Sequence, residues 1–234
     1  MTLACKAQTQ HVPLVGVLTV CAVTVCVGMA MPVSATTHDD VVVGDFAAGN
    51  LTGWQEKVFK GKTRYALVPG DAGMVLMADS QASASGLFRE VKIDLQKTPC
   101  MTWTWQVDGI FDGLDETSKV GDDYPARVYV VFSGGLAFWN TRAINYVWSN
   151  GRPLNSAWPN AFTANSMNVA VQSGPSRVGQ WVSQSRNIRA DFQALIGGHA
   201  SYVDGVAIMS DSDNSGRAAK AYYGDVRFTS ACES

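Results

Sequence analysis

Apolar and polar residues alternate in short runs along most of the chain after residue 35. In residues 101–107 every second position is Met, Trp or Val, whereas the positions between them are Thr or Gln. Successive side chains of a strand point to opposite faces, so this run predicts a strand with one buried face and places Trp103 and Trp105 in the core. Further runs of this kind, bounded by Gly, Asn, Asp or Pro, occur at 66–68, 75–78, 91–95, 127–132, 145–148, 168–171, 181–187, 205–209 and 221–228.

These runs predict an all-β fold. Roughly ten short strands separated by turn residues, without alternating helices, favour an antiparallel β-sandwich of the jelly-roll type over a parallel α/β sheet. Residues 188–195 carry apolar side chains at helical spacing and predict one short helix. Because no fixed-period repeat or low-complexity linker divides residues 36–234, we interpret them as a single domain.

The N-terminal region follows a different pattern. Residues 12–30 carry no Asp, Glu, Lys or Arg, are dominated by Val, Leu, Ala, Cys and Met, and are followed by Pro32-Val33-Ser34-Ala35. An uncharged apolar run that ends in small residues is typical of a secretory signal peptide, so we expect cleavage after Ala35. The protein would then be exported to a bacterial periplasm or the extracellular space and would keep no membrane span. The same run is long enough to serve as a retained membrane anchor, which is the alternative.

Composition narrows the classes of partner. The chain is 47% apolar and 16% charged, as in folded globular proteins rather than disordered ones. Its 18 Lys and Arg against 20 Asp and Glu give a net charge of -2. That balance provides no basic surface for nucleic acid, so we expect no nucleic-acid partner.

Cysteine usage predicts a crosslink. Three of the 5 cysteines lie in the expected signal segment, which leaves Cys100 and Cys232. In an oxidising compartment this pair predicts one disulfide, and two separate buried thiols are the alternative. The sequence has no Cys and His cluster with zinc-binding spacing.

An oxygen-rich turn is the first candidate for ligand chemistry. Residues 211–216 read Asp-Ser-Asp-Asn-Ser-Gly and place Asp211, Asp213 and Ser215 at the first, third and fifth positions of a calcium loop. The twelfth position is Tyr222 rather than Glu, which excludes an EF-hand. Because Asp and Asn favour turns without any metal, a turn that caps its own backbone is the first interpretation, and a Ca²⁺ site is the alternative.

A second cation site could lie where the ends of the domain meet. Asp45 lies near the start of the expected mature chain, and Asp225 lies on the last predicted strand. Opening and closing segments of jelly rolls commonly lie side by side, so a cation between Asp45 and Asp225 would join them.

An acidic region over residues 108–127 is the candidate for catalysis. Two facing carboxylates could act as acid and base in sugar hydrolysis. Asp122 and Asp123 are the main candidates, for binding as well as catalysis, because they precede a Tyr-Pro pair where the chain must be extended, and Arg127 lies close by. We favour a solvated loop whose charges pair with the neighbouring Lys119 and Arg127, and catalysis is the alternative.

Aromatic residues gather with amide and guanidinium groups between residues 139 and 160. Sugars bind aromatic faces flanked by such groups because a pyranose has an apolar C–H face and a rim of hydroxyls. Trp158 lies in a turn-like context and is the predicted stacking platform, with packing over a sheet edge as the alternative. Arg142 and Tyr146 are further predicted ligand-binding residues. The aromatic residues are Trp139, Tyr146, Trp148 and Trp158.

A polysaccharide lyase could also be assembled from this segment. Arg142 and Asn145 would neutralise a substrate carboxylate, and Tyr146 would act as base. Strand alternation argues against this arrangement, because Asn145 points away from the face that Arg142 and Tyr146 share. The sequence has no serine-hydrolase elbow, phosphate-binding loop or zinc-protease motif.

Several segments carry a family resemblance: Gly-Trp at 53–54, Phe-Lys-Gly-Lys-Thr-Arg-Tyr at 59–65, and residues 83–87, 103–108, 119–127, 142–148, 204–209 and 221–226. Together they resemble an exported bacterial family, the domain of unknown function 3047. This resemblance implies an exported β-sandwich and no assigned activity. The chain is similar, more loosely, to carbohydrate-binding jelly-roll modules, a likeness of fold alone.

We therefore expect an exported, non-catalytic β-sandwich that binds a glycan or a cell-envelope component, with Ca²⁺ as the one suggested cofactor. One alternative is a carbohydrate-active hydrolase or lyase that uses residues 108–127. The other is an envelope scaffold with protein partners only.

Overall fold

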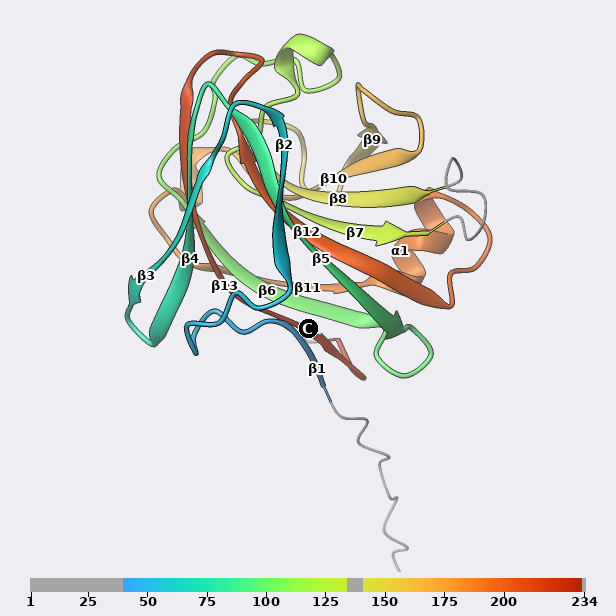
Figure 1. Cartoon of the computed structure of the whole chain (residues 1–234). Coiled ribbons are helices and arrows are strands. Elements are labelled where there is room, and N and C mark those ends of the chain that lie inside the picture. Colours follow the sequence, from blue (N-terminus) through green and yellow to red (C-terminus); the bar gives the residue numbers. More distant parts are fainter. Residues whose placement is uncertain (1–39, 134–140, 233–234) are drawn as a thin grey trace, which may run out of the picture. The chain divides into compact units, whose positions relative to one another are not determined.

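Two β-sheets form most of the structure (Figure 1). This computed structural model describes residues 40–133 and 141–232. The predicted signal segment and Trp139 lie outside the described residues. The strands are β1 (Val41–Gly44), β2 (Trp54–Lys60), β3 (Arg64–Gly70), β4 (Gly73–Gln81), β5 (Ala84–Asp94), β6 (Cys100–Val107), β7 (Arg127–Phe132), β8 (Arg142–Ser149), β9 (Ala157–Pro159), β10 (Ser166–Ser173), β11 (Val182–Asn187), β12 (Tyr202–Asp211) and β13 (Ala218–Thr229).

The two sheets differ in strand order. The six-stranded sheet runs β11-β6-β13-β4-β3, with β1 also paired to β13, and the seven-stranded sheet runs β2-β5-β12-β7-β8-β10-β9. The predicted all-β sandwich is confirmed, with one difference in strand direction. Among the described strands, β8 and β10 pair in parallel and the other pairs are antiparallel. Because β8 and β10 run in the same direction, the chain between them must cross back to the end of the sheet where β8 begins. This connection includes β9, which pairs with β10 at the sheet edge.

Aromatic side chains fill the space between the sheets. Trp103 and Trp105 are fully buried on β6, as the alternation predicts. Their rings meet the rings of the facing sheet, with centroid distances of 5.5 Å from Trp103 to Tyr146 and 6.0 Å from Trp105 to Trp148. Burial of such large side chains provides much of the stability of a domain of this size.

The predicted helix is present as α1 (Ile188–Leu195). It begins at Asn187, whose side chain accepts a hydrogen bond from the Ala190 N–H at 2.9 Å and so satisfies one exposed helix donor. Phe192 packs against Phe132 with ring centroids 4.6 Å apart, which holds the helix over one end of the core. Among the described residues, no helix is long and apolar enough to cross a membrane.

The predicted disulfide is also present. It joins Cys100, at the start of β6, to Cys232, with Cα atoms 5.1 Å apart. Because β6 pairs with β11 on one side and with β13 on the other, the bond fixes the C-terminal segment to an interior strand of the six-stranded sheet.

Candidate functional site

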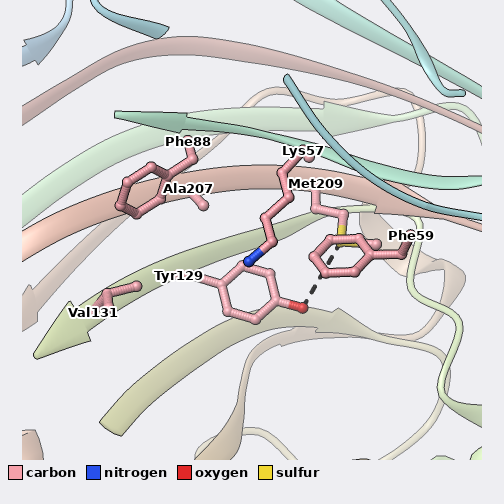
Figure 2. Close-up of a pocket in the computed structure, with 8 residues that line it drawn as sticks. Lys57, Phe59, Phe88, Tyr129, Val131, Ala207 and Met209 are labelled. Carbon is pink, nitrogen blue, oxygen red and sulfur yellow. Dashed lines mark hydrogen bonds between the residues drawn. The ribbon is translucent and has the colours of Figure 1, made fainter. Parts of the chain in front are cut away.

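A groove crosses the outer face of the seven-stranded sheet. Along β7 and β12, Val128, Val130, Val206 and Ile208 point inward to the core, so the residues between them point outward. These outward residues and their neighbours on β2 and β5 line an open hollow of about 340 Å³ (Figure 2). The lining residues are Lys57, Phe59, Gly86, Phe88, Tyr129, Val131, Ala207 and Met209.

Small residues leave room for the aromatic side chains of this groove. Gly205 follows a bulge in the pairing of β12 with β5. A Cβ atom on Gly205 would lie 2.5 Å from Cζ of Phe88, so glycine is needed for the Phe88 ring to lie where it does. Phe59, on the edge strand β2, completes the hydrophobic lining and is 63% exposed.

Tyr129 links the groove to a buried charge cluster. Its hydroxyl accepts a hydrogen bond from Nη1 of Arg127 at 3.0 Å and donates to the sulfur of Met209 at 3.9 Å. Burial raises the pKa of Tyr129 to about 12, although the Arg127 charge opposes the rise. Tyr129 therefore keeps its proton at neutral pH and presents a hydroxyl to the groove.

The buried cluster is centred on Arg127, which is only 2% exposed. Its guanidinium donates from Nε to Asp211 at 2.8 Å and from Nη1 to Asp122 at 3.3 Å, and its Nη2 also bonds both residues. The Tyr124 ring covers the guanidinium at 4.3 Å. Burial raises the pKa of Asp211, while the Arg127 charge lowers it. This arrangement binds the acidic loop to β7 and β12.

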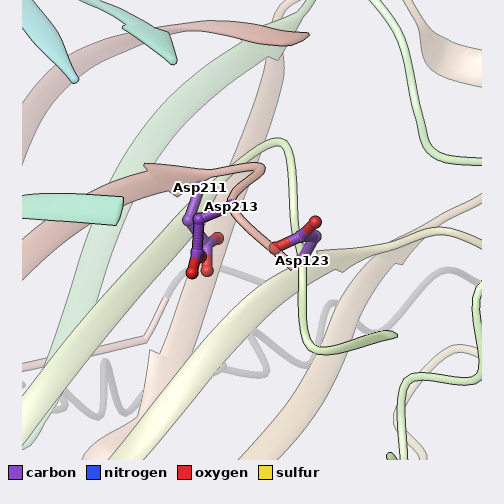
Figure 3. Close-up of side chains that lie close together, drawn as sticks. All are labelled: Asp123, Asp211 and Asp213. Atoms are coloured by element: carbon purple, nitrogen blue, oxygen red, sulfur yellow. The ribbon is translucent and has the colours of Figure 1, made fainter. Parts of the chain in front are cut away.

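Three carboxylates lie together beside this cluster (Figure 3). Ligand atoms of Asp123, Asp211 and Asp213 lie within 4.8 Å of one another. Asp123 is fully buried and accepts hydrogen bonds from the backbone of Asn214 at 3.2 Å and of Ser215 at 2.6 Å. The structure thus brings the predicted pair Asp211 and Asp213 together and adds Asp123, which the turn sequence did not indicate.

Whether a cation fits here depends on which oxygen atoms are free to bind it. Both oxygens of Asp211 already face Arg127, so Asp123 and Asp213 are the carboxylates that could hold a hard ion. The Ser215 hydroxyl is buried and has no hydrogen-bond partner within the described residues, so it could add a third oxygen. Lys60 competes for the same place, because its ammonium lies 3.7 Å from the Asp213 carboxylate.

The second predicted cation pair has other partners. Asp225 accepts a hydrogen bond from the Ala47 N–H at 2.9 Å and pairs with Arg227 at 2.9 Å. Asp45 forms a backbone bridge with Asn50. The opening segment and the closing strand therefore lie side by side, as expected, and are joined by a direct hydrogen bond.

Trp158 occupies a different environment from the one predicted. It lies on β9, is 4% exposed, and donates from its indole N–H to the Glu116 carbonyl at 3.0 Å. The Arg152 guanidinium lies 4.4 Å from the ring centroid, and the Tyr124 ring packs at 6.4 Å. The acidic loop and the sheet edge enclose this ring, so it offers no open face for a sugar.

Arg142, Asn145 and Tyr146 do not converge. Tyr146 faces the core and donates to Asp191 at 2.7 Å, whereas Asn145 is buried on the opposite face and donates to Asn168 at 2.8 Å. Arg142 is exposed at the start of β8. Burial and the Asp191 charge raise the pKa of Tyr146, which makes it a poor base. The geometry of a lyase site is therefore absent from these three residues.

The family comparison agrees with the sequence resemblance. A family model described as protein of unknown function (DUF3047) matches residues 52–227. The chain belongs to the DUF3047 family. The groove residues of this DUF3047 protein all lie within the matched range. No curated protein matches the sequence.

Solved structures that are similar to this one include two carbohydrate-binding modules and an enzyme. The family 11 carbohydrate-binding module of the Clostridium thermocellum cellulase Lic26A-Cel5E is 11% identical, with coverage of 84% of this chain and 97% of the module, at a TM-score of 0.48. The family 30 module of cellulase Cel9D-Cel44B from the same organism is 8% identical, with coverage of 81% and 98% and a TM-score of 0.47. Endoglucanase Cel12A from Rhodothermus marinus is 11% identical, with coverage of 84% and 100% and a TM-score of 0.45.

Sequence reasoning did not identify the groove residues. Phe59 falls in a segment used only for the family resemblance, and Lys57 lies just before it. Lys57 and Phe59 are two residues apart in a charged stretch, and in a strand this spacing places both side chains on the same face. This spacing was the feature from which they could have been predicted.

Proposed function

We propose that this DUF3047 protein is a non-catalytic glycan-binding protein and that the groove on the seven-stranded sheet is its binding site. The observation that carries the proposal is Phe59, an exposed ring that lines an open groove together with Phe88 and Tyr129. The C–H face of a pyranose stacks on such rings, and its hydroxyls bond to polar groups at the rim. Lys57 and the Tyr129 hydroxyl are the polar groups of the lining, and both can donate hydrogen bonds to oxygens of the ligand.

We further propose that the protein is exported and meets its glycan outside the cytoplasm. The Cys100–Cys232 disulfide supports this, because structural disulfides persist in oxidising compartments. The predicted signal segment at residues 1–35 supports it as well. A cell-envelope polysaccharide is a ligand that such a protein would encounter.

Burial of the acidic candidates supports binding over catalysis. A catalytic carboxylate must reach the oxygen that it protonates or the atom that it attacks. Asp122 and Asp123 are both buried, and their oxygens are bonded to Arg127, Asn160 and the 214–215 backbone. They stabilise the loop in this arrangement and do not face the groove lining.

A glycan array, followed by calorimetric titration of the best-bound oligosaccharide, tests the proposal. Phe59→Ala should weaken binding by at least about tenfold, the loss typical of a well-placed aromatic contact. Trp181→Ala is the matched control, because Trp181 is an exposed aromatic residue that lines a separate hollow on the six-stranded sheet.

Other outcomes would contradict the proposal in different ways. Loss of binding in Trp181→Ala but not in Phe59→Ala would move the site to the other sheet. Release of new reducing ends that is abolished by Asp122→Asn or Asp123→Asn would identify a hydrolase. If the protein binds no glycan on the array, the scaffold hypothesis remains. In that hypothesis, exposed side chains of the edge strand β2 contact a protein partner.

A further inference from the structure

The polar side chains of the groove are few and of one kind. Among its eight lining residues, Lys57 carries the single charge, and Tyr129 has the other polar side-chain group. No Asp, Glu, Asn or Gln lines the groove. The groove therefore offers side-chain hydrogen-bond donors and no strong side-chain acceptor.

The ammonium of Lys57 is uncompensated within the described part of the chain. No carboxylate forms an ion pair with it there, whereas Lys60 lies 3.7 Å from Asp213 and Lys62 lies 3.4 Å from Glu56. Strand alternation explains the difference, because Glu56 faces away from the groove and accepts a hydrogen bond from Ser85 at 3.0 Å. Figure 2 shows Lys57 extending from β2 toward Tyr129, and its ammonium lies 5.5 Å from the Phe59 ring centroid.

The Tyr129 hydroxyl adds a second donor. Its oxygen already accepts from Arg127, and its proton faces the Met209 sulfur, which is a weak acceptor. A ligand oxygen would be a better acceptor for this proton. Arg127 itself adds no free positive charge to the groove, because its guanidinium is ion-paired with Asp122 and Asp211.

We propose that the glycan recognised by this groove is anionic, bearing carboxylate or sulfate groups, and that Lys57 selects it. This inference rests on the proposed function. A neutral sugar needs acceptors for its hydroxyl protons, which the lining side chains do not provide, and it would cover the Lys57 ammonium without compensating its charge. An anionic group placed between Lys57 and Tyr129 accepts from both donors, while the sugar ring stacks on Phe59.

Two matched pairs of ligands test the charge dependence. The first pair is a galacturonate hexamer and its methyl-esterified form, and the second is a sulfated galactan oligosaccharide and its desulfated form. Calorimetry should show that at least one charged form binds about fivefold to tenfold more tightly than its uncharged counterpart, as expected for a partly desolvated ion pair. The preference should shrink at 0.5 M salt because exposed charges are screened.

Variants assign the preference to one lysine. Lys57→Gln should remove the difference between charged and uncharged ligands, and Lys57→Arg should retain it. Lys62→Gln is the matched control, since Lys62 is an exposed lysine that is already paired with Glu56. The three variants change two exposed side chains, Lys57 and Lys62, so unchanged melting temperatures would confirm that each variant is folded.

The failures of the two proposals are distinguishable. Equal affinity for charged and uncharged ligands, with both lost in Phe59→Ala and neither affected by Lys57→Gln, would overturn the anionic specificity and leave glycan binding intact. If every glycan bound on the array is neutral, the anionic specificity is likewise overturned and glycan binding is left intact. Absence of every glycan ligand would overturn the proposed function, and the anionic specificity with it.

Discussion

Trp105 is fully buried between the sheets, and its indole N–H has no hydrogen-bond partner among the described residues. Its contribution to stability should therefore come from packing. Trp105→Ala should lower the free energy of unfolding by about 3 to 5 kcal/mol through lost burial and a cavity. Trp105→Phe should cost clearly less, because it keeps a ring and removes an unpaired polar group. Urea unfolding of both variants measures this, and equal losses would contradict the packing explanation.

Replacing Gly205 with alanine adds one carbon atom beside the groove and so tests whether the shape of the groove matters for binding. Alanine there would place a methyl group 2.5 Å from the Phe88 ring, so the ring must move. We expect Gly205→Ala to cost about 1 to 3 kcal/mol of stability, as overpacking commonly does, and to weaken glycan binding. Gly109→Ala is the control, since an added Cβ there meets no atom within 4 Å. Equal affinity in both variants would show that the position of Phe88 does not matter for binding.

Prediction from sequence succeeded for residues whose environment depends on their own strand. Alternation over residues 101–107 placed Trp103 and Trp105 in the core. Trp158 shows the limit, because its burial depends on the Glu116 carbonyl, 42 residues earlier in the chain. A local pattern does not reveal which distant loop covers a side chain.

At the scale of elements, the turn that follows β12 carries the calcium prediction. A bound ion would stabilise the folded state by about 2.7 kcal/mol at a hundredfold excess over Kd. Calcium should then raise the melting temperature relative to chelator, and Asp213→Ala should abolish the rise. Asp225→Ala should leave it unchanged, because Asp225 instead joins β13 to the opening segment. Coincident melting curves in calcium and chelator would contradict the prediction.

The positions of the strands in the sequence were predicted better than the pairing of one strand with another. Buried strands such as β6 and β7 have regular alternation, whereas the edge strand β2 is exposed along most of its length and lacks a clear apolar face. The groove is built by β2, β5, β12 and β7, which are adjacent only through long-range pairing. Its residues are therefore separated in sequence, and no short motif marks them. The parallel pairing of β8 with β10 was missed for the same reason.

At the scale of the whole molecule, the disulfide closes a long stretch of chain. Cys100 and Cys232 are 132 residues apart in sequence, so the bond restricts the unfolded chain strongly. Removing it in a Cys100→Ser, Cys232→Ser double variant should cost about 2 to 5 kcal/mol. Thermal or urea unfolding of this variant, beside wild-type protein with and without reductant, measures the loss. Unchanged stability in both comparisons would show that sheet pairing alone fixes the C-terminal segment.

Glycan binding is proposed for one face of the sandwich, at the groove of the seven-stranded sheet. The most direct test is a nuclear magnetic resonance titration of labelled protein with an oligosaccharide found on the array. We expect chemical-shift changes to concentrate at Phe59, Phe88, Tyr129 and Met209 and to saturate with a single affinity. Changes concentrated instead at Trp181 and Thr104, on the six-stranded sheet, would contradict it.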